Sequence, residues 1–72
     1  MDIARPDDVL EWLAEIGFAN LDAQIADNLR AEGVNGLTVR RWTDADLLHL
    51  GFDIMNDRKT ILVLRDADKR FA

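Results

Sequence analysis

A chain of 72 residues with a formal net charge of −5 has room for one small domain, whose core supplies only about 3–5 kcal/mol of stability. A composition of 49% hydrophobic and 32% charged residues is typical of a soluble globular domain and argues against intrinsic disorder. The absence of cysteine excludes disulfides and thiolate metal sites, and no apolar run reaches the roughly 20 residues of a membrane span, so we expect an intracellular protein, cytoplasmic or nuclear, without a membrane partner.

The first expected helix begins near Pro6. Proline is tolerated in a first helical turn, and Asp7 and Asp8 favour the positive end of the helix dipole. Apolar residues then recur at i, i+3, i+4 and i+7, which predicts one buried face. These residues are Val9, Trp12, Leu13 and Ile16, and Gly17 ends the helix.

A second helix is expected to start near Asn20, whose side chain can cap it, and to end at Gly33. Its buried face is predicted from apolar residues four apart, namely Leu21, Ile25 and Leu29. Only one or two turns fit between Gly36 and Trp42, so residues 37–41 are expected to form a short third helix.

The fourth helix carries the clearest boundary signals. Thr43 is a good N-cap, Asp46 stands three residues later as in a capping box, and Gly51 ends the helix. Its inward residues are Leu47 and Leu50. Asn56 is expected to cap a fifth helix, whose inner face includes Ile61, Leu64 and Phe71.

No segment alternates polar and apolar residues with period two, so the fold class is predicted to be all-α, a compact bundle of five helices. Residues 1–5 are expected to form an N-terminal extension and residues 6–72 the helical domain. Trp12 and Trp42 are assigned to the core.

The residues that enzymes need are scarce. The chain has no serine, tyrosine or cysteine to act as a nucleophile, and His49 is its single histidine. Asp44 and Asp46 are two residues apart on a helix, where side chains diverge, so they do not form a carboxylate pair or a calcium loop. The four glycines stand isolated at helix ends, where a positive φ is useful. We therefore expect no catalysis, cofactor, metal or small-molecule substrate.

The order and spacing of these elements resemble the sterile alpha motif (SAM) domain family. The motifs that carry the resemblance are Val9-x-x-Trp12-Leu13, Val34-Asn35-Gly36, Trp42-Thr43, Asp46-Leu47, Leu50-Gly51-Phe52 and Arg58-x-x-Ile61. None of them is specific alone, but the ordered set is. The resemblance implies a five-helix fold and a non-catalytic protein–protein interaction domain.

The chain departs from the family pattern at four places. The stretch from Gly17 to Gly36 is longer than usual by about one helical turn, which predicts a longer second helix. Asn56-Asp57 replaces a Gly-His pair before the fifth helix, Arg65 replaces a common apolar residue within it, and Arg40 replaces a leucine.

Many SAM domains associate head to tail, which joins a mid-loop surface of one copy to an end-helix surface of the next. A contact between two different surfaces does not close on itself, so it produces open polymers. On the positions that match the family, the end-helix surface comprises Met55, Asn56, Asp57, Arg58 and Lys59, and the mid-loop surface comprises Thr38, Asp44, Asp46, Leu48 and His49.

Two apolar residues precede Asn56. Ile54 is expected to close the bottom of the core, whereas Met55 suits either the core or an exposed contact equally well. Leu48 is expected to face solvent, because Leu47 and Leu50 face inward. Asp46 has an alternative role as the cap of its own helix.

The charge distribution favours self-association. Residues 1–55 hold eleven acidic and four basic side chains, a net charge of −7, whereas residues 56–72 hold five basic and three acidic ones, a net charge of +2. We therefore expect copies of the chain to bind one another and to scaffold or oligomerise a larger protein. The main alternative is a monomeric module that binds one other SAM domain through a single surface.

RNA hairpin binding is a weaker alternative. Some SAM domains bind RNA through a basic patch at the start of the fifth helix, where this chain has Arg58 and Lys59. The net charge of −5 and the intervening Asp57 disfavour a polyanion, because phosphate contacts demand more lysine and arginine.

Overall fold

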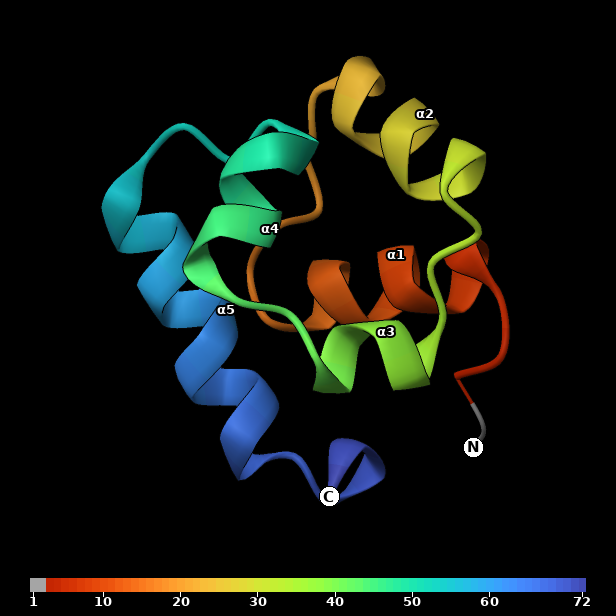
Figure 1. The fold of residues 1–72 in the computed structure, drawn as a ribbon, viewed down its shortest axis with the longest axis vertical. Helices are drawn as coiled ribbons and strands as arrows, with labels where there is room; N and C mark the ends of the chain where they lie inside the picture. Colours follow the sequence, from red (N-terminus) through yellow and green to blue (C-terminus); the bar gives the residue numbers. More distant parts are fainter. Residues whose placement is uncertain (1–2) are drawn as a thin grey trace.

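The computed structural model describes residues 3–72, in which all regular elements are helical (Figure 1). In chain order they are α1 (Pro6–Glu15), α2 (Ala23–Ala31), α3 (Gly36–Arg40), α4 (Asp44–Leu50), α5 (Met55–Ala67) and a 3₁₀ turn, η1 (Lys69–Phe71). Helix α2 packs on α1 and α4, and α5 packs on α3 and α4. The predicted all-α fold with five helices is confirmed.

The first and fourth helices have the boundaries that the sequence predicts. Pro6 is the first residue of α1. At α4, the Thr43 hydroxyl accepts a hydrogen bond from the Asp46 amide at 3.3 Å, and the Asp46 carboxylate accepts one from the Thr43 amide at 2.9 Å. Gly51 then ends the helix with φ of 115°, and a side chain there would also approach Ile25 to 3.0 Å.

The second helix starts later than predicted. Asp22, not Asn20, is the N-cap, because its carboxylate accepts a hydrogen bond from the Gln24 amide at 2.8 Å. Leu21 therefore precedes α2, although it still packs against the core. The helix is nine residues long, shorter than the span predicted from Asn20 to Gly33, and residues 20–22 belong to the connection before it.

The fifth helix differs from its prediction at both ends. It begins at Met55 with Ile54 as N-cap, so Asn56 lies inside the helix and does not cap it. Leu64 is 36% exposed, because Arg65 takes the inward position one turn after Ile61. Phe71 is buried as predicted, but it belongs to η1, which folds back from the end of α5.

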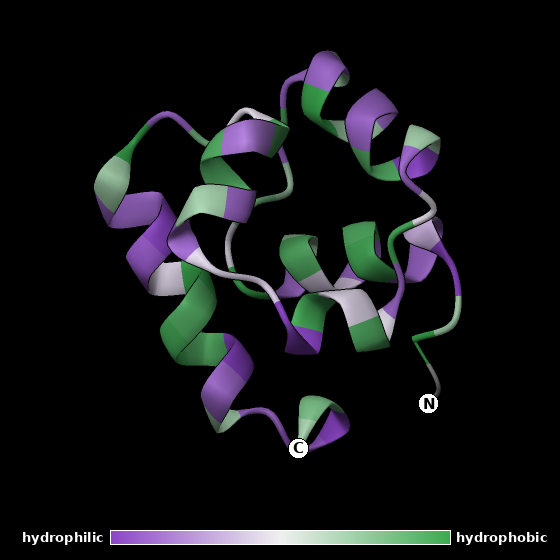
Figure 2. Ribbon diagram, in the orientation of Figure 1, coloured by the Kyte–Doolittle hydropathy of each residue, from purple (hydrophilic) through white to green (hydrophobic). Residues whose placement is uncertain are grey.

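Apolar side chains from every helix form a single core, as the helical periodicity predicts. Figure 2 shows hydrophobic and hydrophilic residues interspersed along the helices. The most buried members of the core are Val9, Trp12, Leu13, Leu29, Val39, Leu47 and Ile61. Trp42 is only 5% exposed, which confirms the assignment of both tryptophans to the core.

Ile3 also belongs to this core, on the N-terminal side of the predicted domain boundary. Its carbonyl accepts a hydrogen bond from the Gly36 amide at 2.6 Å, and a Cβ on Gly36 would lie 2.9 Å from the same oxygen. Gly36 has no positive φ, so this close approach, and not backbone conformation, requires glycine there. The boundary at residue 6 stays a prediction, and residues 1–2 lie outside the described residues.

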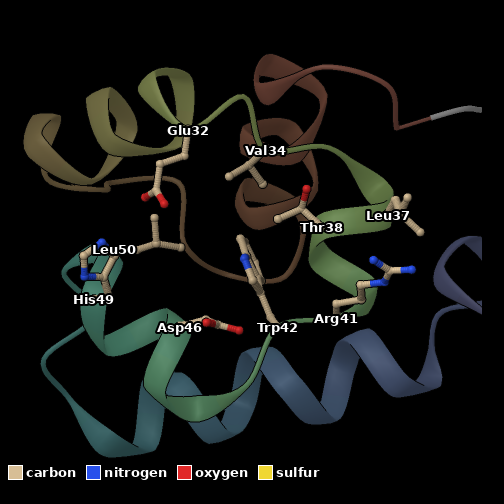
Figure 3. A pocket seen from close by; sticks show the side chains of 9 residues that line it. All are labelled: Glu32, Val34, Leu37, Thr38, Arg41, Trp42, Asp46, His49 and Leu50. Carbon is tan, nitrogen blue, oxygen red and sulfur yellow. The ribbon is translucent and has the colours of Figure 1, made fainter.

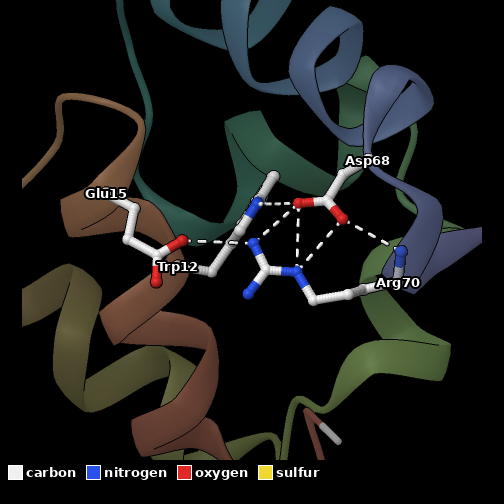
Figure 4. A network of polar contacts seen from close by, with 4 residues as sticks. All are labelled: Trp12, Glu15, Asp68 and Arg70. Atoms are coloured by element: carbon white, nitrogen blue, oxygen red, sulfur yellow. Dashed lines mark hydrogen bonds and ion pairs between the residues drawn. The ribbon is translucent and has the colours of Figure 1, made fainter. Parts of the chain in front are cut away.

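Four side chains hold η1 against α1 and form what we call the C-terminal latch: Trp12, Glu15, Asp68 and Arg70 (Figure 4). The Trp12 indole N–H and the Arg70 guanidinium both donate to the Asp68 carboxylate, at 3.1 and 2.7 Å, and Arg70 also donates to Glu15. The latch places Phe71 edge-on against Trp12, with ring centroids 4.8 Å apart. The hydrogen bonds from Arg70 lower the pKa of Asp68 to about 2, although burial opposes the shift.

We expect the C-terminal latch to weaken in acid. The folded-state pKa of Asp68 lies below its usual 3.8, so ionised Asp68 stabilises the fold above about pH 4, and this contribution is lost as the pH falls towards 2. In an NMR titration, the indole N–H resonance of Trp12 should move over that range, whereas that of Trp42 should not. Asp68→Asn should cost about 1–3 kcal/mol at neutral pH and abolish the movement. A Trp12 resonance unchanged between pH 4 and 2 in the unsubstituted protein would contradict the assignment.

Candidate interaction surfaces

A hollow of about 340 Å³ opens between α3, α4 and the end of α2, and we call it the α3–α4 hollow (Figure 3). The residues that line it are Glu32, Val34, Leu37, Thr38, Arg41, Trp42, Asp46, His49 and Leu50. Its lining residues come from the end of α2, the segment after it, α3, the connection after α3, and α4.

The α3–α4 hollow is apolar in the middle and mainly acidic at its edge. The Trp42 ring lies near its centre, with the Glu32 carboxylate at the end of α2 and the Asp46 carboxylate on α4 (Figure 3). Leu37 is 55% exposed and lies with Arg41 at the far end. Such a hollow is suited to an apolar side chain that is accompanied by a positive charge.

The structure divides the predicted mid-loop surface. Thr38, Asp46 and His49 line the α3–α4 hollow, whereas Asp44 and Leu48 do not. Leu48 is 49% exposed, as its position predicts. Thr38 and Asp46 also cap the starts of their own helices, so both have a local structural role.

The start of α5 carries an exposed apolar pair. Ile54 is 62% exposed, so the prediction that it lies in the core is wrong. Met55 is 58% exposed, so it lies outside the core and is available for a contact. The chain turns outward here because Phe52, two residues before Ile54, already fills the core position. We call Ile54, Met55 and the exposed Lys59 one turn later the α5 tip.

No side chain caps the first turn of α5. In α2, α3 and α4, by contrast, the N-cap side chain accepts a hydrogen bond from a first-turn amide. The positive end of the α5 dipole therefore lies at the α5 tip without a capping side chain, and it favours a carboxylate there, although Asp57 already places one in the first turn.

The remaining members of the predicted end-helix surface are not equivalent. Asn56 is exposed, whereas Asp57 is half-buried beside the connection between α1 and α2. Arg58 is buried, with 8% exposure, because its guanidinium donates to the Phe52 carbonyl at 2.7 Å and to the Asp44 carboxylate at 2.9 Å. Arg58 and Asp44, predicted on two opposite surfaces, are therefore joined within one chain.

Two other arginines of the basic C-terminal segment also bond within the chain. Arg65 donates to the carbonyls of Val39 and Trp42 at the end of α3, and Arg70 belongs to the C-terminal latch. Within residues 3–72, the lysines of this segment, Lys59 and Lys69, make no ion pair. The start of α5 thus presents one free cation, which gives RNA binding no structural support.

The sequence did not place on an interaction surface six of the residues that line the α3–α4 hollow: Glu32, Val34, Leu37, Arg41, Trp42 and Leu50. Leu37 could have been found, because it is apolar, follows the Asn35-Gly36 cap and lies off the face that carries the buried Val39. Glu32 could not, because it ends α2 and meets α4 only through tertiary packing.

In the part of the chain that the structure describes, no helix is long and apolar enough to cross a bilayer. Among these same residues, no group of three or more histidine or carboxylate side chains is arranged to hold a metal ion.

The family model for the SAM domain (sterile alpha motif) matches residues 1–63, which is most of the chain. No curated protein and no solved structure matches it.

Proposed function

Because the chain belongs to the SAM domain family, whose members are generally protein–protein interaction modules, we propose that it self-associates head to tail. In this contact the α5 tip of one copy inserts into the α3–α4 hollow of the next. A pair joined in this way keeps one free tip and one free hollow, so the assembly grows as an open polymer that scaffolds or oligomerises the protein carrying it.

The exposed apolar pair at the α5 tip supports this proposal most strongly. Ile54 and Met55 are more than half exposed side by side, although the rest of the molecule has core positions for most of its large apolar residues. Methionine is flexible enough to fill an irregular apolar hollow, and Trp42 provides the apolar surface at the centre of the α3–α4 hollow.

The charges around the two surfaces are complementary in part. Lys59 and the positive end of the α5 dipole can face Glu32 and Asp46 at the edge of the α3–α4 hollow, whereas Asp57 in the first turn of α5 and Arg41 in the hollow oppose this pairing. The side chains of Glu32, Asp46 and Lys59 are exposed to solvent, so they orient the contact and raise the association rate more than the affinity. We therefore expect the association to weaken as the salt concentration rises.

Met55→Glu should abolish self-association. The substitution places a carboxylate at the α5 tip, next to the acidic edge of the α3–α4 hollow. It therefore removes the burial of an apolar side chain and adds repulsion between carboxylates. Multi-angle light scattering at increasing protein concentration should show large species for the unsubstituted protein and monomers for the variant. Lys69→Glu also introduces a carboxylate, at an exposed site outside both surfaces, and should leave association unchanged.

A mixing experiment tests the head-to-tail geometry itself. Leu37→Glu should block the α3–α4 hollow as Met55→Glu blocks the tip, so each variant alone should be monomeric. Mixed together, the intact tip of the Leu37→Glu copy can still enter the intact hollow of the Met55→Glu copy. The mixture should therefore form a discrete dimer, and a mixture that stays monomeric would refute the geometry.

An unsubstituted protein that is monomeric at all concentrations would leave the alternative function, binding of one other SAM domain through a single surface. In that case the protein should bind another SAM domain, and only one of the two substitutions, Met55→Glu or Leu37→Glu, should abolish this binding. Retardation of an RNA hairpin in a gel would instead favour RNA binding, which the buried Arg58 does not support.

A further inference from the structure

The side of α5 that faces away from the bundle carries an apolar patch. Val63 is 65% exposed, the largest fraction for a large apolar side chain in residues 3–72, and the adjacent Leu64 is 36% exposed. With Lys59 and Thr60 they line a shallow hollow of about 260 Å³. Figure 1 shows α5 at the edge of the molecule, and its packing partners α3 and α4 lie on its inner side. This outer face is separate from the α3–α4 hollow.

The patch has opposite charges at its two ends. Lys59, Val63 and Asp66 are spaced i, i+4 and i+7, so they lie along one stripe of α5. The Lys59 ammonium has no hydrogen-bond or ion-pair partner among residues 3–72. The Asp66 side chain is 70% exposed even though it pairs with Arg65 at 2.8 Å. Read along the helix, the stripe is positive, apolar and then negative.

We propose that this outer face of α5 binds the same face of a second copy, with the two helices antiparallel about a two-fold axis near Val63. Because the two helices run in opposite directions, Lys59 of each copy lies opposite Asp66 of the other. Val63 packs against its equivalent, and Leu64 covers one side of the contact. The contact is isologous, because each copy contributes the same surface.

A second copy is the occupant that the charges favour. An unrelated helix would need a negative, apolar and positive order at matching spacing, whereas another copy has that order through symmetry alone. Like charges would meet if the two helices ran parallel, because Lys59 would then face Lys59 and Asp66 would face Asp66. The same stripe therefore selects the antiparallel arrangement.

The contact is small, because it involves one face of one helix on each copy and lies below the roughly 800 Å² per partner of a stable interface. We expect a dissociation constant of about 0.1–1 mM. The α5 pairing shares Lys59 with the α5 tip, but Val63, Leu64 and Asp66 lie outside both head-to-tail surfaces, so the pairing can join head-to-tail chains side by side.

The test is made in the Leu37→Glu background, which blocks the α3–α4 hollow but leaves α5 unchanged. Sedimentation equilibrium at up to about 1 mM should show a monomer–dimer equilibrium. The α5 dimer is expected in this background whether or not the unsubstituted protein associates head to tail. Adding Val63→Glu should remove the dimer, since it buries two carboxylates on the axis. Adding Glu11→Lys, a charge change on the exposed surface of α1, serves as the control and should leave the dimer intact.

Charge reversal distinguishes this geometry from other contacts. Lys59→Glu or Asp66→Lys alone should each weaken the dimer about tenfold, because each replaces two attractive pairs with two repulsive ones. Together they restore opposite charges across the two-fold axis and should return the dissociation constant to within about twofold of the starting value. Circular dichroism of each variant checks that it is folded. A folded background variant that is monomeric at 1 mM, or a double reversal that fails to restore the dimer, would overturn the proposal.

Discussion

Replacing Trp12 with alanine should leave a chain that does not fold at room temperature. Trp12 is fully buried in α1, packs edge-on against Phe71 and donates its indole N–H to Asp68. Truncation of a buried aromatic to alanine costs about 3–5 kcal/mol, which equals the whole stability expected of a core this small. Loss of the α-helical circular dichroism signal and collapse of NMR amide dispersion would confirm the prediction.

Trp12→Phe separates the two contributions. Phenylalanine keeps most of the apolar volume but has no N–H for Asp68, so the loss should be about 1–3 kcal/mol and the protein should remain folded. Chemical denaturation measures both variants. A well-folded Trp12→Ala protein would mean that α1 and η1 contribute much less to stability than their burial indicates.

Arg58→Ala should destabilise the protein by about 2–3 kcal/mol, although sequence position places Arg58 on an interaction surface. Its guanidinium is the donor to the buried Phe52 carbonyl, and its side chain fills space between α4 and α5. The bond to Asp44 adds less, because the Asp44 side chain is 53% exposed. The unfolding midpoint in urea should fall by a large fraction of its value.

Lys59→Ala is the matched control, because Lys59 is the next residue on the same helix and carries the same charge. It is exposed and should change the stability by less than about 0.5 kcal/mol. Arg58→Lys should recover only part of the loss, since an ammonium cannot donate to Phe52 and Asp44 in the fixed geometry of a guanidinium. Equal stabilities of Arg58→Ala and Lys59→Ala would contradict the structural role of Arg58.

Three arginines of the C-terminal segment form hydrogen bonds within the chain, and this changes the electrostatic argument for self-association. The C-terminal segment has an excess of positive charge, but Arg58, Arg65 and Arg70 donate most of their hydrogen bonds within the chain. What the α5 tip offers a partner is therefore an apolar pair, a helix start without a capping side chain and one lysine. The proposed contact depends on apolar burial first and on charge second.

The sequence predicts the helices and most of the core because those features depend on neighbours three or four residues away. The capping box at Thr43 and the apolar spacing through Val9 and Trp12 act within one or two turns of the chain. The predictions fail where two local signals compete. Asn20 and Asp22 can both cap α2, and Asp22 is the one whose carboxylate reaches a first-turn amide.

The candidate surfaces are predicted only in part. The exposure of Leu48 follows from its position opposite Leu47 and Leu50, which helical periodicity reveals. The exposure of Ile54 and Leu64 does not, because an apolar residue at a helix boundary or on the flank of a helix fits either environment. Their neighbours in the folded state, Phe52 and Arg65, occupy the inward positions and leave them outside.

The sequence by itself thus determined the fold class, the order of the helices, the family, and the lack of serine, tyrosine and cysteine side chains. The tertiary structure alone decided which cations remain free, how the end of α2 and the start of α4 enclose a hollow, and which face of α5 is left uncovered. Local periodicity and capping are encoded between near neighbours in the chain. The direction of a long arginine side chain depends on carbonyls and carboxylates that folding brings from 6 to 26 residues away, as Arg58 and Arg65 show.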